Sequence, residues 1–268
     1  MQARSVWPAP FLIMQLAFLS PRLRTSGIHV GVSAFVAAAA SLLVFRFWYP
    51  SPFAAIAGGT QLFLMLVSID AMMGPLLTGV AASPGKPRRE LVRDLSVIVV
   101  LQLVAFGYGM YSMALARPVA LVYEIDLLRL VTAADLEPAT LSEASPELRT
   151  LSWHGPTLLA VVKPQDPAEQ LRTVELGMAG IPLAMLPRYW REYAAHADAA
   201  WRAARPVAAL LARYPASADA VAQVAAASGQ PASALRFLPL QARRSDWVAL
   251  LAAPGARVVG YLPLEGFF

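Results

Sequence analysis

The chain has 268 residues, of which 57% are hydrophobic and only 15% are charged, whereas an average soluble domain has about a quarter charged residues. Eight of its 22 Lys and Arg residues and three of its 17 Asp and Glu residues lie in residues 1–116, so the whole net charge of +5 resides there. Residues 117–268 are balanced in charge and hold no basic cluster with interleaved aromatic residues, which argues against a nucleic-acid partner. The chain has no cysteine, which excludes disulfides, thiolate metal sites and a cysteine nucleophile.

Residues 1–26 precede the first segment that is long enough to cross a membrane. Their apolar run, Phe11–Leu19, has nine residues, whereas a spanning helix needs about 20. No small-residue cleavage site follows this run, and Arg22 comes soon after it, so the pattern does not fit a signal peptide. We interpret residues 1–26 as a cytoplasmic or interfacial extension whose translation start is either Met1 or Met14.

Three apolar runs follow, and each is long enough to cross a bilayer. They are Gly27–Phe47, Thr60–Val80 and Leu95–Leu115. The short loops between the runs leave little room for a soluble fold that buries all three of them. We therefore predict a region of three transmembrane helices over residues 27–116.

The short segments beside the spans predict their orientation. The loop Pro84–Arg93 carries four basic residues and three arginines precede the first span, whereas Trp48–Gly59 carries no charge. The positive-inside rule then places the N-terminus and the basic loop in the cytoplasm. Arg46 opposes this assignment, but an arginine at a helix end can extend to the far headgroups. Because the chain crosses three times, residues 117–268 are predicted to lie in the periplasm.

Residues 117–268 are long enough to form a domain with its own core. Apolar residues alternate over residues 119–126, which predicts a strand directly after the third span, and Leu128 and Leu130 indicate a return strand. Another strand is predicted at Thr157–Lys163. With strands at both ends and helices between them, the predicted fold is a membrane protein with three N-terminal helices followed by an α+β periplasmic domain.

The middle of this domain is predicted to be helical. One apolar stripe repeats at steps of three and four residues: Trp190, Tyr193, Ala197, Trp201 and Ala204. A new helix is predicted to begin at Pro206, and Ser217 to cap an alanine-rich helix that ends at Gly229.

The last strands are predicted to form a β-hairpin. The segments Trp247–Leu251 and Arg257–Leu262 flank a turn in which Pro254 is followed by Gly255. This order fits a type II turn, because glycine takes the positive φ of its third position without strain.

A four-residue repeat also marks this part of the chain, as Phe-Leu-Pro-Leu from Phe237 and Tyr-Leu-Pro-Leu from Tyr261. A proline inside a strand removes one hydrogen-bond donor and so favours a sheet edge or a bulge. One interpretation is an edge that accepts a partner strand through Phe237, Pro239, Tyr261 and Pro263. The other, which we favour, is two sheet edges that end at the same kind of bend.

The sequence offers little for catalysis. Its three histidines, His29, His154 and His196, are not spaced with another histidine or a carboxylate as a metal site requires. No nucleophile elbow, P-loop or Rossmann glycine run is present. Ser152 lies close to His154, but with no orienting acid nearby we interpret this segment as a surface loop. We expect no enzyme activity, cofactor, metal or small-molecule substrate.

Asp70 lies in the middle of the second span, where an ionisable residue costs roughly 2.5–3.5 kcal/mol and marks a functional candidate. Counting residues places Asp70 about 15 Å and Gln102 about 11 Å from the cytoplasmic face, so their side chains can meet if the spans pack together. His29 is expected to lie too near that face to join them. With Gly74 and Pro75 on the same span, Asp70 and Gln102 make a candidate intramembrane partner site. The alternative is a protonated, hydrogen-bonded Asp70 with a structural role.

Five short segments occur in an order that, with the three spans, points to one family: Phe47–Pro50, Asp70–Thr78, Pro84–Leu91, Ala116–Val119 and Gly260–Phe267. Nearly everything from Arg22 onward resembles the type IV pilin accessory proteins of the TfpX/TfpZ type. The resemblance implies a multi-pass protein of the bacterial inner membrane that acts like a chaperone for one pilin. The pilin is held in the membrane by one apolar helix and has a globular head outside. The implied partners are this helix, the head and the lipid bilayer, and no catalytic residue is implied.

Two other classes of function stay open. A membrane-anchored sensor could bind a ligand in its periplasmic domain, but the loop Ala81–Asp94 and a short tail leave no room for a cytoplasmic output domain. An integral-membrane enzyme needs paired polar groups at one depth, and only Asp70 and Gln102 qualify. Co-purification from detergent separates the three classes by what accompanies the protein: a pilin, a ligand or neither.

Overall fold

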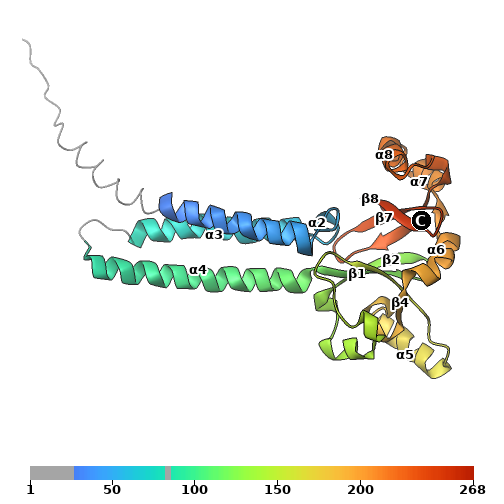
Figure 1. Ribbon diagram of the computed structural model, residues 1–268, viewed down its shortest axis with the longest axis horizontal. Helices are drawn as coiled ribbons and strands as arrows, with labels where there is room; N and C mark the ends of the chain where they lie inside the picture. The colour runs from blue at the N-terminus through green and yellow to red at the C-terminus, as the bar shows by residue number, and fades with distance from the viewer. Residues whose placement is uncertain (1–26, 82–85) are drawn as a thin grey trace, which may run out of the picture. The chain divides into compact units, whose positions relative to one another are not determined.

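The computed structural model describes residues 27–81 and 86–268, so the predicted extension over residues 1–26 lies outside the described residues (Figure 1). In the described part, three helices are long and apolar enough to cross a membrane. They are Gly27–Trp48, α3 (Gly59–Ala81) and α4 (Arg88–Ala116). The three predicted spans are thus confirmed by length and composition. The helix α4 begins before the predicted span because its charged first turns continue the same helix.

These helices leave most of their large apolar side chains exposed, among them Phe35 and Val104. Their backbone groups are paired within each helix, which is the arrangement that a bilayer core demands. A surface of this kind is favourable in lipid and unfavourable in water, so the exposed side chains agree with a membrane-anchored chain.

The described residues form two compact units. The helical unit comprises residues 27–43 and Gln61–Met113, and the sheet unit comprises Val44–Thr60 and Ala114–Phe268. The division falls inside the long helices, so a few residues of each helix belong to the sheet unit. The sheet unit is therefore larger than the predicted domain over residues 117–268.

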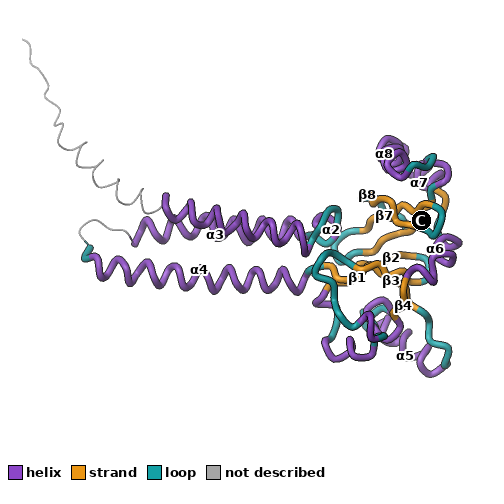
Figure 2. The backbone as a smooth tube through the Cα atoms, viewed as in Figure 1, coloured by secondary structure: helices purple, strands orange, loops and turns teal. Residues whose placement is uncertain are grey.

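The sheet unit is built on one eight-stranded mixed sheet, which Figure 2 shows as the cluster of orange strands. The strand order is β4-β3-β1-β2-β6-β7-β8, and β5 also pairs with β6. The pairs β1–β3 and β2–β6 are parallel and the others are antiparallel. The strands are β1 (Pro118–Glu124), β2 (Leu127–Thr132), β3 (Thr157–Val161), β4 (Trp190–Glu192), β5 (Arg205–Pro206), β6 (Arg236–Gln241), β7 (Asp246–Ala252) and β8 (Arg257–Leu262).

Short helices surround this sheet, and the predicted α+β class is confirmed. They are α2 (Phe53–Ile56), α5 (Pro167–Met178), α6 (Ala197–Ala203), α7 (Val207–Arg213) and α8 (Ala218–Ser228). The predicted strands after the third span are present as β1 and β2. Every residue of β1 is buried, because β1 is a central strand with neighbours on both sides.

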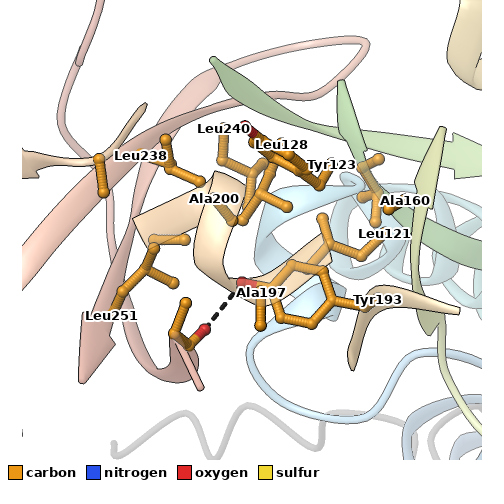
Figure 3. Packing of buried hydrophobic residues seen from close by; sticks show 14 of the residues in the cluster. Leu121, Tyr123, Leu128, Ala160, Tyr193, Ala197, Ala200, Leu238, Leu240 and Leu251 are labelled. Carbon is orange, nitrogen blue, oxygen red and sulfur yellow. Dashed lines mark hydrogen bonds between the residues drawn. The ribbon is translucent and has the colours of Figure 1, made fainter. Parts of the chain in front are cut away.

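The largest core cluster lies between the central strands and α6 (Figure 3). Leu121, Leu128 and Leu240 from three different strands are almost completely buried in it. Tyr193 closes one side of the cluster, and its hydroxyl donates a hydrogen bond of 2.8 Å to the carbonyl of Ala256. Burial raises the pKa of Tyr193 to about 12, because the ionised ring oxygen would lose its water.

The connection between the first helix and α3 contributes to the sheet unit. Ile56 of α2 is fully buried in the largest core cluster, and Tyr49 is fully buried as well. A Cβ on Gly59 would come within 2.4 Å of the Tyr49 ring, so only glycine fits at this position. We expected this segment to be an uncharged interhelical loop within residues 27–116. It belongs to the sheet unit because its apolar side chains complete a core there.

The side chains of the predicted apolar stripe from Trp190 are buried, apart from the half-buried Trp201, but the predicted helical backbone is wrong in part. Trp190 lies in the edge strand β4, where it pairs with Val161, and its indole N–H donates to the carbonyl of Ala184 at 2.9 Å. Tyr193 lies in a 3-10 turn, and the α-helix begins only at Ala197. Steps of three and four residues also bury successive side chains through a strand and a turn, so the period alone misassigned these residues.

The later helices agree closely with the sequence. The helix α7 begins just after Pro206, and Ser217 is the N-cap residue of α8. The hydroxyl of Ser217 donates back to the carbonyl of Tyr214 and does not bond the helix N-terminus. Gly229 ends α8 with a φ of 71°, which is the left-handed conformation that glycine adopts most easily.

The predicted hairpin is present as β7 and β8. Gly255 has a φ of 75°, as the turn requires, but Ala256 also has a positive φ of 47°. Ala256 is the fourth residue of that turn, and a type II turn does not constrain its φ, so the turn type stays a prediction while the glycine lies where the turn needs it.

Candidate functional site

The helical unit brings together the two polar side chains that the sequence placed at one depth. The Gln102 side-chain amide donates a hydrogen bond of 3.2 Å to a carboxylate oxygen of Asp70. Asp70 lies on α3 and Gln102 on α4, so the bond joins two membrane-spanning helices. The prediction that these side chains meet is confirmed. It succeeded because a helix rises by the same amount at each residue, so depth can be counted from the sequence.

His29 also belongs to this cluster, so the expectation that it would not join Asp70 and Gln102 is wrong. Its ring nitrogen Nδ1 lies 3.2 Å from the hydroxyl oxygen of Thr78, and the two groups form a hydrogen bond. A Cβ on Gly74 would lie 2.4 Å from His29 Nε2 and 2.5 Å from Gln102 Nε2. Because Gly74 has no side chain, both the imidazole of His29 and the amide of Gln102 fit beside it. Counting the depth of backbone positions does not show how far these side chains extend.

One face of α3 carries the cluster. Asp70, Gly74 and Thr78 follow one another at four-residue steps, which place them on the same side of the helix. Thr78 is almost completely buried and Asp70 is half-buried. The sequence feature that could have indicated Thr78 and His29 is this row of residues at four-residue steps, together with a histidine on a neighbouring helix. Pro75, the fourth predicted site residue, lies inside α3 and does not line the cavity described next.

A cavity of about 280 Å³ lies over this cluster and is lined by all three helices. We call it the intramembrane groove, and its lining residues are Ile28, His29, Val32, Ser33, Val36, Asp70, Thr78, Leu95, Val99, Gln102, Leu103 and Phe106. Its walls are apolar, and several of the wall side chains are exposed on the helix surface. Four of its polar lining residues, by contrast, gather at the row on α3: His29, Asp70, Thr78 and Gln102. The groove thus combines an apolar wall with a small number of hydrogen-bonding groups, which is the composition of a binding site.

The carboxylate of Asp70 has unused capacity for hydrogen bonds. Within residues 27–81 and 86–268, the structure gives it Gln102 as a hydrogen-bond partner and pairs it with no Lys, Arg or His side chain. An ionised carboxylate offers about four acceptor positions on its two oxygens. One amide donor therefore leaves most of this capacity open toward the groove. Among the described residues, no three side chains of the metal-binding types come together.

The second candidate site, the repeated Leu-Pro-Leu motif, divides between two places. Phe237 and Pro239 lie in β6, which is a central strand, and Phe237 is completely buried. These two residues therefore do not lie at an edge. Pro239 lies where β6 changes neighbour, between its pairing with β5 at Phe237 and its pairing with β2 at Leu240, so its missing N–H costs the sheet little.

The second copy of the motif lies where it was predicted. β8 is an edge strand, and Tyr261 within it packs its ring against Phe53 at 5.4 Å between centroids. Pro263 follows the end of the strand and is exposed. Contacts of Tyr261 and Pro263 with a partner strand stay a prediction.

A cluster at the start of β1 was not predicted from the sequence. The guanidinium of Arg117 lies 4.0 Å from the centroid of the Trp153 ring and donates to the carbonyl of Ala114. Among the residues that the structure describes, its Nε has no hydrogen-bond partner. Burial lowers the pKa of Arg117, and the nearby Tyr49 acts in the opposite direction. Trp153 also packs against Trp48. The loop that we interpreted as a plain surface segment is thus a packing element of the sheet unit.

Comparisons with known proteins add to this geometry. Residues 17–58 match the family described as fimbrial assembly protein FimB. The chain is 36% identical to the fimbrial assembly protein of serogroup E1 of Dichelobacter nodosus, over 85% of this chain and 90% of that protein. It is also 36% identical to the serogroup I protein of the same organism over the same shares of the two chains. The protein of serogroups C1 and C2 is 44% identical over 42% of this chain and 86% of its own length. No solved structure matches the chain.

Proposed function

Because the chain belongs to the family of fimbrial assembly proteins, we propose that it holds a type IV pilin in the bacterial inner membrane until the pilin enters a pilus. The names of the relatives support a role in pilus assembly. The finer step, stabilisation of the pilin in the manner of a chaperone, is our inference. In this role the protein acts by binding and performs no chemical step.

One observation carries this proposal, namely that a single chain combines three membrane-spanning helices with a separate, well-packed sheet unit. A pilin before assembly also has two parts, an apolar membrane helix and a globular head. A protein with an apolar part and a folded part can contact both, whereas a soluble chaperone reaches only the head. The intramembrane groove offers a surface for the first contact.

The proposed topology has the basic segment around Lys86 in the cytoplasm and the sheet unit in the periplasm, as the distribution of charge supports. Fusions to alkaline phosphatase test it, because this enzyme is active only outside the cytoplasm. A fusion after Arg117 should be active and a fusion at Lys86 inactive. The opposite pattern would contradict the orientation.

The function is tested by removing the protein from cells that make its pilin. We expect the amount of pilin in the inner membrane to fall and surface pili to be lost, and both to return when the chain is supplied again. Immunoblotting of membrane fractions and electron microscopy of cells measure the two effects. If the pilin persists at its normal level while pili are lost, the protein acts at a later step and the chaperone role is wrong.

Co-purification from detergent gives an independent test. The pilin should accompany the full-length chain through purification in a mild detergent. If a small molecule accompanies the sheet unit and no pilin is recovered, the alternative of a membrane-anchored ligand sensor replaces the proposal.

A further inference from the structure

We infer that the intramembrane groove binds the membrane helix of the pilin and that the carboxylate of Asp70 pairs with a positively charged group on that helix. The inference rests on the proposed function, and it adds the binding surface and the chemistry of recognition. It starts from the open hydrogen-bonding capacity of Asp70, which a single amide donor from Gln102 does not fill.

The charge of Asp70 decides what kind of group completes the site. Asp70 is the one acidic residue within the apolar part of the spans, since Glu90 and Asp94 lie in the charged first turns of α4. Asp94 already pairs with Lys86 and Arg93, whereas Asp70 pairs with no cation among the described residues. An unpaired carboxylate at bilayer depth is costly, and a cation from another molecule removes that cost.

Three occupants could fill the groove, and its apolar walls and hydrogen-bonding groups distinguish them. An acyl chain of a lipid matches the apolar walls but offers no hydrogen-bond donor to Asp70 or Thr78. A second copy of α3 would bring a second Asp70 to the same depth, where two carboxylates repel each other. A membrane helix with apolar sides and one cationic group matches both the walls and the charge. The pilin is held in the membrane by an apolar helix, and we assign the cationic group to that helix.

Two leucines on α4 allow a matched test of the occupant. Leu103 lines the groove and is 63% exposed, whereas Leu101 does not line it and is 61% exposed. A photoreactive benzoylphenylalanine is placed at one position or the other in the full-length protein, in cells that make the pilin. Illumination should link the pilin to position 103 and leave it unlinked at position 101.

The remaining outcomes of this test overturn the inference. If position 103 links only to lipid, the groove is filled by acyl chains, and if it links to a second copy of this chain, the groove is a self-association surface. If the pilin co-purifies with the protein but does not link at position 103, the groove is not the binding surface while the chaperone function stands. The failure of the inference is thus distinguishable from the failure of the function.

The role of the charge is tested at position 103 with Asp70→Asn, which keeps the shape and the hydrogen bond to Gln102 and removes the charge. We expect the yield of linked pilin to fall about tenfold, the loss that corresponds to one hydrogen bond to a charged group. Asp70→Glu retains the carboxylate and should keep most of the yield. An unchanged yield with Asp70→Asn would show that the carboxylate takes no part.

A second measurement covers the case in which Asp70→Asn does not accumulate. Neutralising the positive charge on the pilin closest to the linked position, with this chain left unchanged, should lower the yield by a similar factor. If the yield does not change, the pairing of charges is wrong even though the pilin occupies the groove.

Discussion

The two units of the molecule expose opposite kinds of side chain. In the sheet unit, Leu128 and Phe237 are fully buried and most charged residues lie on the surface, although Arg117 and Glu124 are buried. In the helical unit, large leucines and valines point outward, while Thr78 and Gly74 lie inside with the half-buried Asp70. The same preference of apolar groups for apolar surroundings produces both patterns, because the surroundings are water in one case and lipid in the other. Substitutions that matter in one unit are therefore expected at different residue types from those that matter in the other.

The largest effect is expected when the sheet unit loses the segment Val44–Thr60. Without it the core lacks Ile56 and Tyr49, and removing a single large buried side chain costs about 2–5 kcal/mol. A fragment of residues 117–268 should unfold without a clear cooperative transition, whereas one with residues 44–60 joined to residues 114–268 by a flexible linker should unfold cooperatively. Circular dichroism in increasing urea compares the two. Equal transition midpoints would mean that the segment adds nothing to the core.

The next effect is expected from Gly59→Ala, which adds a methyl group 2.4 Å from the fully buried ring of Tyr49. A buried ring cannot move aside easily, so the variant should be destabilised by about 1–3 kcal/mol, as other overpacked cores are. Gly107→Ala is the matched control, because no atom lies within 4 Å of its added carbon. Thermal unfolding of the full-length chain in detergent measures both. A Gly59→Ala protein as stable as the control would contradict the packing around Tyr49.

A smaller effect is expected inside the helical unit from Gly74→Ala. The added carbon would meet the ends of two flexible side chains, His29 and Gln102, which can move but then lose their hydrogen bonds to Thr78 and Asp70. One such bond between membrane helices is worth about 0.6–2 kcal/mol, so the loss should be of that size. Gly31→Ala, in open space on the first helix, is the control. The melting temperature in detergent and the linked yield at position 103 should fall together, and a change in neither would contradict the cluster.

The smallest effect is expected from pH, and in the sheet unit. Burial raises the pKa of Tyr193 and of Tyr261 to about 12, above the value near 10 of an unfolded tyrosine. Stability from these neutral rings is complete below about pH 10 and is lost as pH rises toward about 12, because only the unfolded chain releases the protons in that window. Unfolding in urea at several alkaline pH values measures the loss. In Tyr193→Phe the loss should be smaller, and a slope equal to that of the unchanged protein would exclude Tyr193 as a source.

The sequence predicted best where local rules decide the structure. The spans follow from the thickness of a bilayer, and the meeting of Asp70 with Gln102 follows from the constant rise of a helix. The strands β1 and β2 and the hairpin of β7 and β8 follow from alternation and turn residues. In each case the information lies within a short stretch of chain.

The sequence predicted poorly where a distant partner decides the structure. Trp190 becomes part of a strand because Val161 pairs with it, and β6 becomes central because β2, far earlier in the chain, takes its open side. Ile56 joins a core cluster whose other buried residues begin only at Leu121, beyond the third span. His29 reaches Gly74 because a side chain is absent there. Such contacts between distant parts of the chain cannot be predicted from periodicity and composition.

The parallel pairing of β2 with β6 has a consequence for the synthesis of the protein. Leu128 of β2 pairs with Leu240 of β6, which leaves the ribosome on the order of a hundred residues later. Pairings between residues so far apart in the chain form slowly. During that time the growing chain exposes the edge of β2, which is a template for unwanted association with other chains. Of the two pairings that β2 makes, the one with β6 is thus expected to form last. A nascent chain that stops before Arg236 would leave that edge open.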